Sequence, residues 1–182
     1  MNLESGKNGN IITFNGINPK IHPSVFICSG VHIIGDVEID EDTSIWYNTV
    51  IRGDVNYIRI GKRNSIQDLS MLHVTTKTHP LIIGSDITIA HSVTLHGCTL
   101  EDKCFIGMGA TVLDGAVISS NSLIAAGAVI REGFHVPEGV LVAGVPGKIV
   151  RNLSPEDIIK MENNIKNYLG YVKEYKNQLY LG

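Results

Sequence analysis

Aliphatic residues recur at every sixth position through most of this chain, from Ile27 to Ile130, with three short breaks. A period of six fits neither the 3.6-residue period of an amphipathic helix nor the strict alternation of a half-buried strand. It is typical of a parallel β-helix, in which each hexapeptide supplies one short strand and one turn. All sixteen positions carry Ile, Leu or Val: Ile27, Ile33, Ile39, Ile45, Ile51, Ile60, Ile66, Leu72, Ile83, Ile89, Leu95, Ile106, Val112, Ile118, Ile124 and Ile130.

This pattern predicts an all-β fold, a left-handed parallel β-helix over residues 1–152. Three hexapeptides should complete a triangular coil of about eighteen residues. Each aliphatic residue should point inward and stack on its equivalent one coil away, about 4.8 Å along the axis. Many of them are followed four positions later by a small or β-branched residue: Val31, Val37, Thr43, Thr49, Val55, Ala110, Ala116, Ser122 and Ala128.

The pattern changes to helical spacing near the C-terminus. Ser154 is a typical N-cap, Pro155 suits the first helical position, and Glu156 and Asp157 are favourable in the first turn. We therefore predict an α-helix within residues 153–182, packed outside the β-helix as part of the same domain. Its apolar side should consist of Ile158, Met161, Ile165, Tyr168, Leu169, Val172 and Tyr175.

The register of the repeat predicts where two histidines point. His73 and His96 each directly follow an inward aliphatic residue, so both should point outward. Their separation equals one coil plus an insertion of about five residues, which we place around Thr75–Pro80. The two imidazoles should therefore stack on one face, one coil apart. Arg52 belongs to the same column, one coil below His73.

A third histidine, His91, lies two residues after Ile89 and should stack above Asp68 on the neighbouring side of the triangle. Side chains that leave two faces of a prism diverge, so one subunit should not bring all three imidazoles to one metal ion. In a homotrimer, His73 and His96 of one subunit would meet His91 of the next at three equivalent interfaces.

Three neutral imidazoles with a fourth position open to water make a catalytic Zn²⁺ site, and Fe²⁺ or Co²⁺ also suits these ligands. The alternative from the register alone is an interface without metal. The histidines would then be hydrogen-bonding groups of the subunit contact, together with Arg52, Gln67 and Asp68.

Composition limits the other classes of function. The 182 residues are 43% hydrophobic and carry a net charge of −3, with no basic stripe of the kind that binds nucleic acid. No apolar run resembles a signal peptide or a membrane span, so we expect a cytoplasmic protein without membrane contact. Cys28, Cys98 and Cys104 lack CxxC spacing, and we expect reduced thiols.

Several motifs in this order resemble the γ-class carbonic anhydrases, and in particular the short bacterial γ-carbonic anhydrase-like proteins. The similarity runs from about residue 11 through the C-terminal helix. The motifs are Arg52-Gly53-Asp54, Gln67-Asp68, His73, and the stretch from His91 to Gly97 with its HxxxxHG pattern.

This resemblance implies a trimeric left-handed β-helix that hydrates CO₂ reversibly to bicarbonate. It implies His73, His91 and His96 as metal ligands, divided between two subunits. Arg52 and Asp54 correspond to an interface ion pair beside the site, and Gln67 to the residue that positions the metal-bound water. Asp68 and Asn64 match nearby motif positions, and Asp68 is expected either to orient a ligand imidazole or to be purely structural.

The chain departs from the archetypal γ enzyme in the groups that move protons. That enzyme has a glutamate directly after its RGD-like motif and an acidic loop between the first two ligands. Here Val55 stands after Asp54, and the loop between Val74 and Pro80 contains no carboxylate. A histidine has an unperturbed pKa of about 6.5, which makes His79 a candidate to replace the missing shuttle. Tyr168 is a second candidate to reach the site from the helix.

Two other classes of function fit the same scaffold. Related trimeric β-helix proteins include acyltransferases and CoA-thioester hydrolases, although Lys62, Arg63 and Lys77 are too scattered to form an obvious site for the CoA phosphates. The absence of the usual shuttle also allows a non-catalytic protein that binds a metal or a siderophore.

Overall fold

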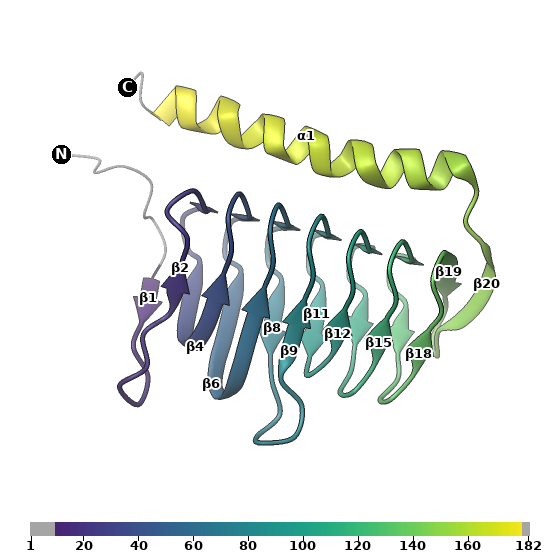
Figure 1. Ribbon diagram of the computed structural model, residues 1–182, viewed down its shortest axis with the longest axis horizontal. Coiled ribbons are helices and arrows are strands. Elements are labelled where there is room, and N and C mark those ends of the chain that lie inside the picture. The colour runs from purple at the N-terminus through teal and green to yellow at the C-terminus, as the bar shows by residue number, and fades with distance from the viewer. Residues whose placement is uncertain (1–9, 180–182) are drawn as a thin grey trace.

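The computed structural model describes residues 10–179, which form a left-handed parallel β-helix with one long helix along its outside (Figure 1). The predicted fold class is therefore confirmed. The first nine residues, on which the expectation about a signal peptide partly rests, lie outside the described residues. No helix within residues 10–179 is long and apolar enough to cross a membrane.

The β-helix has three faces, each a ladder of short strands. The first face is a sheet of β3 (Phe26–Ile27), β5 (Ser44–Ile45), β7 (Ser65–Ile66), β10 (Thr88–Ile89), β13 (Phe105–Ile106), β16 (Leu123–Ile124) and β19 (Val140–Ala143), closed by the antiparallel β20 (Lys148–Asn152).

The other two faces are joined into one sheet by β4 (His32–Ile39) and β6 (Val50–Ile60), which run across the corner between them. The second face adds β1 (Asn10–Ile12), β8 (Met71–His73), β11 (Thr94–His96), β14 (Thr111–Val112) and β17 (Val129–Ile130). The third face adds β2 (Lys20–Ile21), β9 (Leu81–Ile83), β12 (Thr99–Leu100), β15 (Val117–Ile118) and β18 (His135–Val136).

The core consists of the predicted aliphatic column on each face. All sixteen predicted positions are buried, with at most 5% of each residue exposed. The pattern does not distinguish Val55, which is 41% exposed because the chain runs on through the long strand β6 at this point. The pattern also missed Leu100, which is 1% exposed and pairs with Ile83 and Ile118, because it stands five residues after Leu95.

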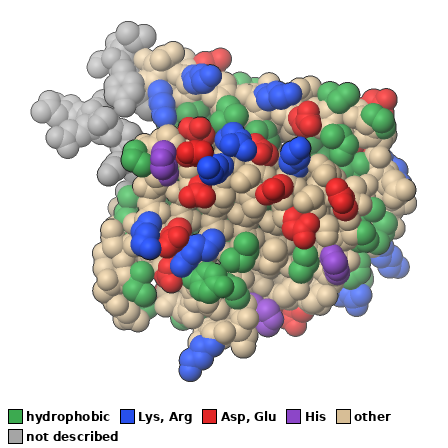
Figure 2. Space-filling view, viewed as in Figure 1, with side chains coloured by type: hydrophobic (Ala, Val, Ile, Leu, Met, Phe, Trp, Pro, Cys, Tyr) green, Lys and Arg blue, Asp and Glu red, His purple; other side chains and the backbone are tan. Residues whose placement is uncertain are grey.

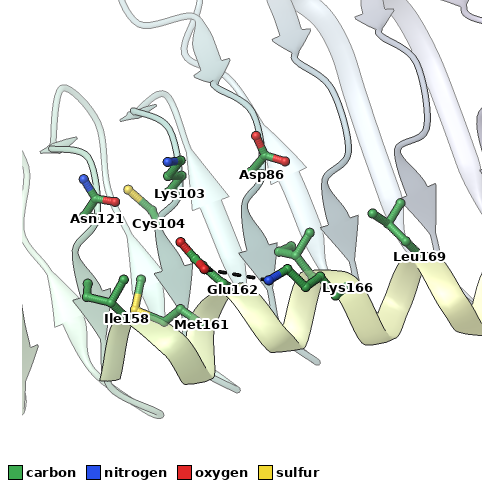
Figure 3. A pocket seen from close by; sticks show the side chains of 10 residues that line it. Asp86, Lys103, Cys104, Asn121, Ile158, Met161, Glu162, Lys166 and Leu169 are labelled. Atoms are coloured by element: carbon green, nitrogen blue, oxygen red, sulfur yellow. Dashed lines mark ion pairs between the residues drawn. The ribbon is translucent and has the colours of Figure 1, made fainter. Parts of the chain in front are cut away.

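Helix α1 (Pro155–Leu179) packs against the first face. The hydroxyl of Ser154 accepts a hydrogen bond from the backbone N–H of Asp157 over 3.3 Å, as expected of an N-cap. Trp46 lies at the centre of the packing, with ring centroids 5.3 Å from Tyr168 and 5.2 Å from Tyr175. The helix leaves a cavity of about 310 Å³ against this face, between Met161 and Cys104 (Figure 3).

The third face carries charges of both signs. Figure 2 shows Lys and Arg side chains interspersed with Asp and Glu over this side of the molecule. Arg59 lies 2.8 Å from Asp36, and Lys20 lies 2.8 Å from Glu38. Such a mixed, hydrated surface is ordinary for a face that contacts solvent.

Candidate metal centre

The two histidines of the second face stack as the register predicted. β8 and β11 are parallel neighbours, and His73 is paired with His96 across them. β6 lies one coil below, where Ile51 pairs with Leu72, so Arg52 continues the same outward column. This part of the geometric prediction is confirmed.

The side-chain contacts of this pair orient one nitrogen of each ring toward the other ring. Nδ1 of His73 lies 3.1 Å from Nε2 of His96. The remaining nitrogens face carboxylates: Nε2 of His73 lies 3.0 Å from Oδ1 of Asp54, and Nδ1 of His96 lies 2.7 Å from Oδ1 of Asp114. An ionised carboxylate only accepts, so the nitrogen facing it carries the proton.

The two facing nitrogens have a separation suited to one metal ion. Bonds of 2.0–2.1 Å to Zn²⁺ at the tetrahedral angle place two ligand nitrogens about 3.4 Å apart. The observed 3.1 Å between the rings of His73 and His96 is close to this value. Both imidazoles thus present the chemistry of metal ligands, one nitrogen held by a carboxylate and the other left with its lone pair.

Electrostatics favour the neutral form of His73. Burial lowers the pKa of His73 and the charge of Arg52 lowers it further, against the opposite effect of Asp54. Burial alone would raise the pKa of Asp54, but hydrogen bonds from Arg52 and His73 hold it below its usual value. Arg52 and Asp54 form the ion pair that the family resemblance implied. A neutral imidazole is the form that binds metal.

Asp114, the carboxylate beside His96, was missed by the sequence analysis. It follows β14 by two residues, one coil above His96, and its other oxygen accepts a hydrogen bond from the hydroxyl of Thr75 over 2.6 Å. Burial alone would raise the pKa of Asp114, but the hydrogen bonds from Thr75 and His96 lower it. Extending the outward column by one coil leads to Leu113, which directly follows Val112, so Asp114 stands one position beyond the column.

His91 lies on the neighbouring side of the β-helix, two residues after the end of β10. Its Nδ1 is 2.8 Å from Oδ2 of Asp68, so a third imidazole also has one nitrogen against a carboxylate. Within residues 10–179, no group of three or more His, Cys, Asp or Glu residues of one chain is arranged to hold a metal. This agrees with the prediction from the register that His91 diverges from His73 and His96.

Gln67 and Asn64 are both buried polar residues of the coil below His91. Gln67 is 3% exposed; its backbone N–H donates to the carbonyl of Ile89 over 2.8 Å, and its backbone carbonyl accepts from the hydroxyl of Thr49 over 3.0 Å. Asn64 is 1% exposed and donates to the carbonyls of Gly61 and Gly84 over 3.0 and 2.8 Å. Its oxygen accepts from the backbone N–H of Ile87. Asn64 therefore joins its own turn, which begins at Gly61, to the turn from Gly84 to Ile87 one coil above, and the structure gives it a structural role instead of the contact with the site suggested by its motif.

The candidate proton-transfer residues lie on different sides of the molecule. His79 is half-buried at the end of the inserted loop, against Gly97 and Gly115 and close to Asp114. Tyr168 packs on Trp46 from helix α1. Burial raises the pKa of Tyr168, and the nearby charge of Asp68 raises it further. His79 is thus near His96, whereas Tyr168 is near the side of His91.

Comparisons with known proteins support the family resemblance. The model of the bacterial transferase hexapeptide family (six repeats) matches residues 18–53 and 97–132. A crystal structure of a hexapeptide transferase family protein from Anaplasma phagocytophilum is 38% identical, with a TM-score of 0.87 over 91% of this chain and 98% of that one.

Several curated relatives carry carbonic anhydrase names. "Gamma carbonic anhydrase 2, mitochondrial" of Arabidopsis thaliana is 38% identical over 88% of this chain, which spans only 60% of that protein's length. "Carbonic anhydrase" of Geobacillus kaustophilus is 46% identical over 166 residues, covering 91% of each chain. At this identity over nearly the full length of both proteins, the chain belongs to the γ-class carbonic anhydrase-like family of hexapeptide-repeat proteins.

Proposed function

We propose that this protein catalyses the reversible hydration of CO₂ to bicarbonate, at a metal ion held between subunits by His73, His91 and His96. The observation that carries the proposal is the common environment of the three imidazoles. Each has one nitrogen against a carboxylate, at 3.0 Å for His73, 2.8 Å for His91 and 2.7 Å for His96, which leaves the other nitrogen available to a metal.

A homotrimer completes the site, because one chain offers two ligands on one face and the third on another. Apolar side chains around His91 support a contact with a second copy. Leu69, Met71 and Met108 are 62%, 38% and 59% exposed in the single chain, and a subunit interface would remove them from water. Cyclic contacts of this kind give three equivalent sites per trimer.

The metal supplies a nucleophile at neutral pH, since a Zn²⁺ ion held by three histidines lowers the pKa of bound water to about 7. Zn²⁺ fits three neutral nitrogen ligands, and Fe²⁺ or Co²⁺ fits them as well. The ligands are neutral, so they leave the full charge of the ion in place.

The residues of the chain have separate tasks in this proposal. Asp54 and Asp68 hold the imidazoles of His73 and His91. Gln67, which directly follows β7 and is 3% exposed in the single chain, orients the attacking oxygen by donating a hydrogen bond from its side-chain amide. The proton released in each turnover passes to solvent through His79, with Tyr168 as the alternative from the opposite side.

A metal-dependent acyltransferase or CoA-thioester hydrolase is the second candidate. It is favoured by the 38% identical crystal structure, which carries the name of a hexapeptide transferase family protein. A protein that binds a metal or siderophore without catalysis uses the same ligands. Assays of acyl-CoA hydrolysis and acyl transfer on metal-loaded protein would separate these candidates from CO₂ hydration.

A complementation experiment tests whether the site is shared between chains. His91→Ala trimers and His73→Ala/His96→Ala trimers should each lose metal and CO₂ hydration in stopped-flow assays. Equal coexpression of the two variants with different tags should restore about one quarter of the sites, because each subunit contributes either His91 or the pair.

The outcomes separate the hypotheses. Recovery of metal and hydration in the mixed trimers supports the proposal, whereas mixed trimers without metal contradict a site divided in this way. Wild-type trimers that bind metal but do not hydrate CO₂, loaded with either zinc or iron, contradict the proposed reaction and leave the shared site standing.

A further inference from the structure

The two side-chain oxygens of Asp114 contact a candidate metal ligand and the inserted loop. Oδ1 lies 2.7 Å from Nδ1 of His96, and Oδ2 accepts the hydroxyl of Thr75 over 2.6 Å. The side chain is only 21% exposed, so water competes weakly for these contacts.

The contact with His96 fixes the ring in one tautomer and one orientation. A proton on Nδ1, donated to Asp114, leaves the lone pair on Nε2, the nitrogen that faces Nδ1 of His73. Without the carboxylate, the ring would be free to rotate about its side-chain bonds. The other tautomer, with the proton on the nitrogen needed by the metal, would also gain population.

The contact with Thr75 holds the start of the loop that ends at His79. The backbone N–H of Thr75 donates to the carbonyl of His79 over 3.0 Å, which closes the loop on itself. Asn56 donates from its side chain to the carbonyl of Thr75 over 3.0 Å. The carboxylate of Asp114 therefore lies at the base of a short, closed loop.

Gly97 makes room for this arrangement. It has a φ of +53°, and a Cβ atom there would overlap Oδ1 of Asp114 and lie 2.7 Å from Cβ of His79. Any side chain at this position would displace either the carboxylate or the loop. The glycine directly after His96 is thus explained by the close approach of both groups.

We propose that Asp114 is a positioning residue that orients His96 toward the metal with one oxygen and anchors the loop carrying His79 with the other. The inference rests on the proposed function for its metal, but the two contacts exist in the chain without it. A single carboxylate then links the geometry of a ligand to the position of the candidate proton acceptor.

The test uses the full-length trimer and three variants. Asp114→Ala should weaken zinc binding by about 10- to 100-fold in competition with a chelator, the usual cost of removing a carboxylate behind a ligand histidine. Asp114→Asn keeps an accepting oxygen and should lose less. Thr75→Val should leave zinc affinity within about twofold of the wild type and increase hydrogen exchange over residues 75–79. Asp36→Asn, which alters an ion pair on the charged third face, is the matched control and should change neither property.

A metal-independent readout separates failure of this inference from failure of the proposed function. In ¹⁵N spectra of the metal-free trimer, His96 should carry its proton on Nδ1 in the wild type and shift toward the Nε2–H tautomer in Asp114→Ala. The same tautomer in both proteins, with zinc affinity unchanged within twofold, would overturn the inference. A tautomer shift in a protein that binds no zinc would uphold the role of Asp114 in holding His96 and contradict the proposed metal site instead.

Discussion

At the scale of the residue, the neighbour of each histidine decides which of its nitrogens can bind a metal. Asp54 engages Nε2 of His73, whereas Asp114 engages Nδ1 of His96. The two rings therefore present different nitrogens to the space between them. The same residue type, one coil apart in one column, is used in two tautomers, and the distinction comes entirely from where the carboxylates lie.

His79 offers a test of proton transfer at this scale. In weak buffer, His79→Ala should lower the rate of CO₂ hydration, because the loop has no carboxylate to replace it as a proton acceptor. We expect a decrease of about tenfold, since positioned proton transfer commonly contributes more than that. Added imidazole should restore the rate. The measurement is stopped-flow hydration across buffer concentrations, and an unchanged rate in weak buffer would remove His79 from the mechanism.

The sequence predicted the directions of His73, His91 and His96 because the repeat converts position in the chain into position in space. It did not predict Asp114. Leu95 and its partner Val112 are only seventeen residues apart, so the outward position one coil above His96 is Leu113, and Asp114 lies one position beyond it. Asn64 was assigned to the site by its motif alone. Its three bonds to turn backbone depend on which coils are neighbours, and a family pattern does not reveal them.

At the scale of the element, the period of six was sufficient for the short strands but not for the corners. β4 and β6 run through a corner as single strands, with a register irregularity between Gly35 and Val37. Breaks in the repeat indicate where such corners lie, but they do not predict the backbone conformation at the corner. The helix was more predictable, because Ser154 and Pro155 mark its start and its apolar spacing marks the side that packs on Trp46.

The packing of these elements makes a prediction about the cysteines. Cys28, Cys98 and Cys104 are all at most 4% exposed, and burial raises the pKa of each to about 12. At pH 8 only about one thiol in ten thousand would be ionised, against about a quarter for an exposed thiol with a pKa near 8.5. The native protein should therefore react with a thiol reagent at least about a thousandfold more slowly than after unfolding in urea.

An exposed cysteine is the control for this experiment. Asn163→Cys places a thiol on the exposed side of helix α1 and should react at once, while the three native thiols remain unmodified. Rapid labelling of a native cysteine in the folded wild type would show that helix α1 or a coil opens readily, contrary to the packing described.

At the scale of the whole molecule, a metal site divided between chains would couple metal binding to assembly of the trimer. Each metal ion would join His73 and His96 of one chain to His91 of the next, so removal of metal should weaken the trimer. Ligand linkage adds about 4 kcal/mol of stability per site when free metal exceeds its dissociation constant a thousandfold. The Tm of the wild type should therefore fall on chelation and recover when zinc is restored.

Two variants make this coupling specific. His91→Ala should melt at the same temperature with and without chelator, since it cannot complete the site. His135→Ala removes an exposed histidine on the third face, where its ring contacts Ser119, and should keep the full response. Sedimentation at low protein concentration should show dissociation under the same conditions that lower the Tm.

A zinc-dependent Tm in His91→Ala equal to that of the wild type would mean that metal binds within one chain. The trimer would then be held by its apolar contacts alone, and the divergence of His91 from the other two histidines would have no role in metal binding.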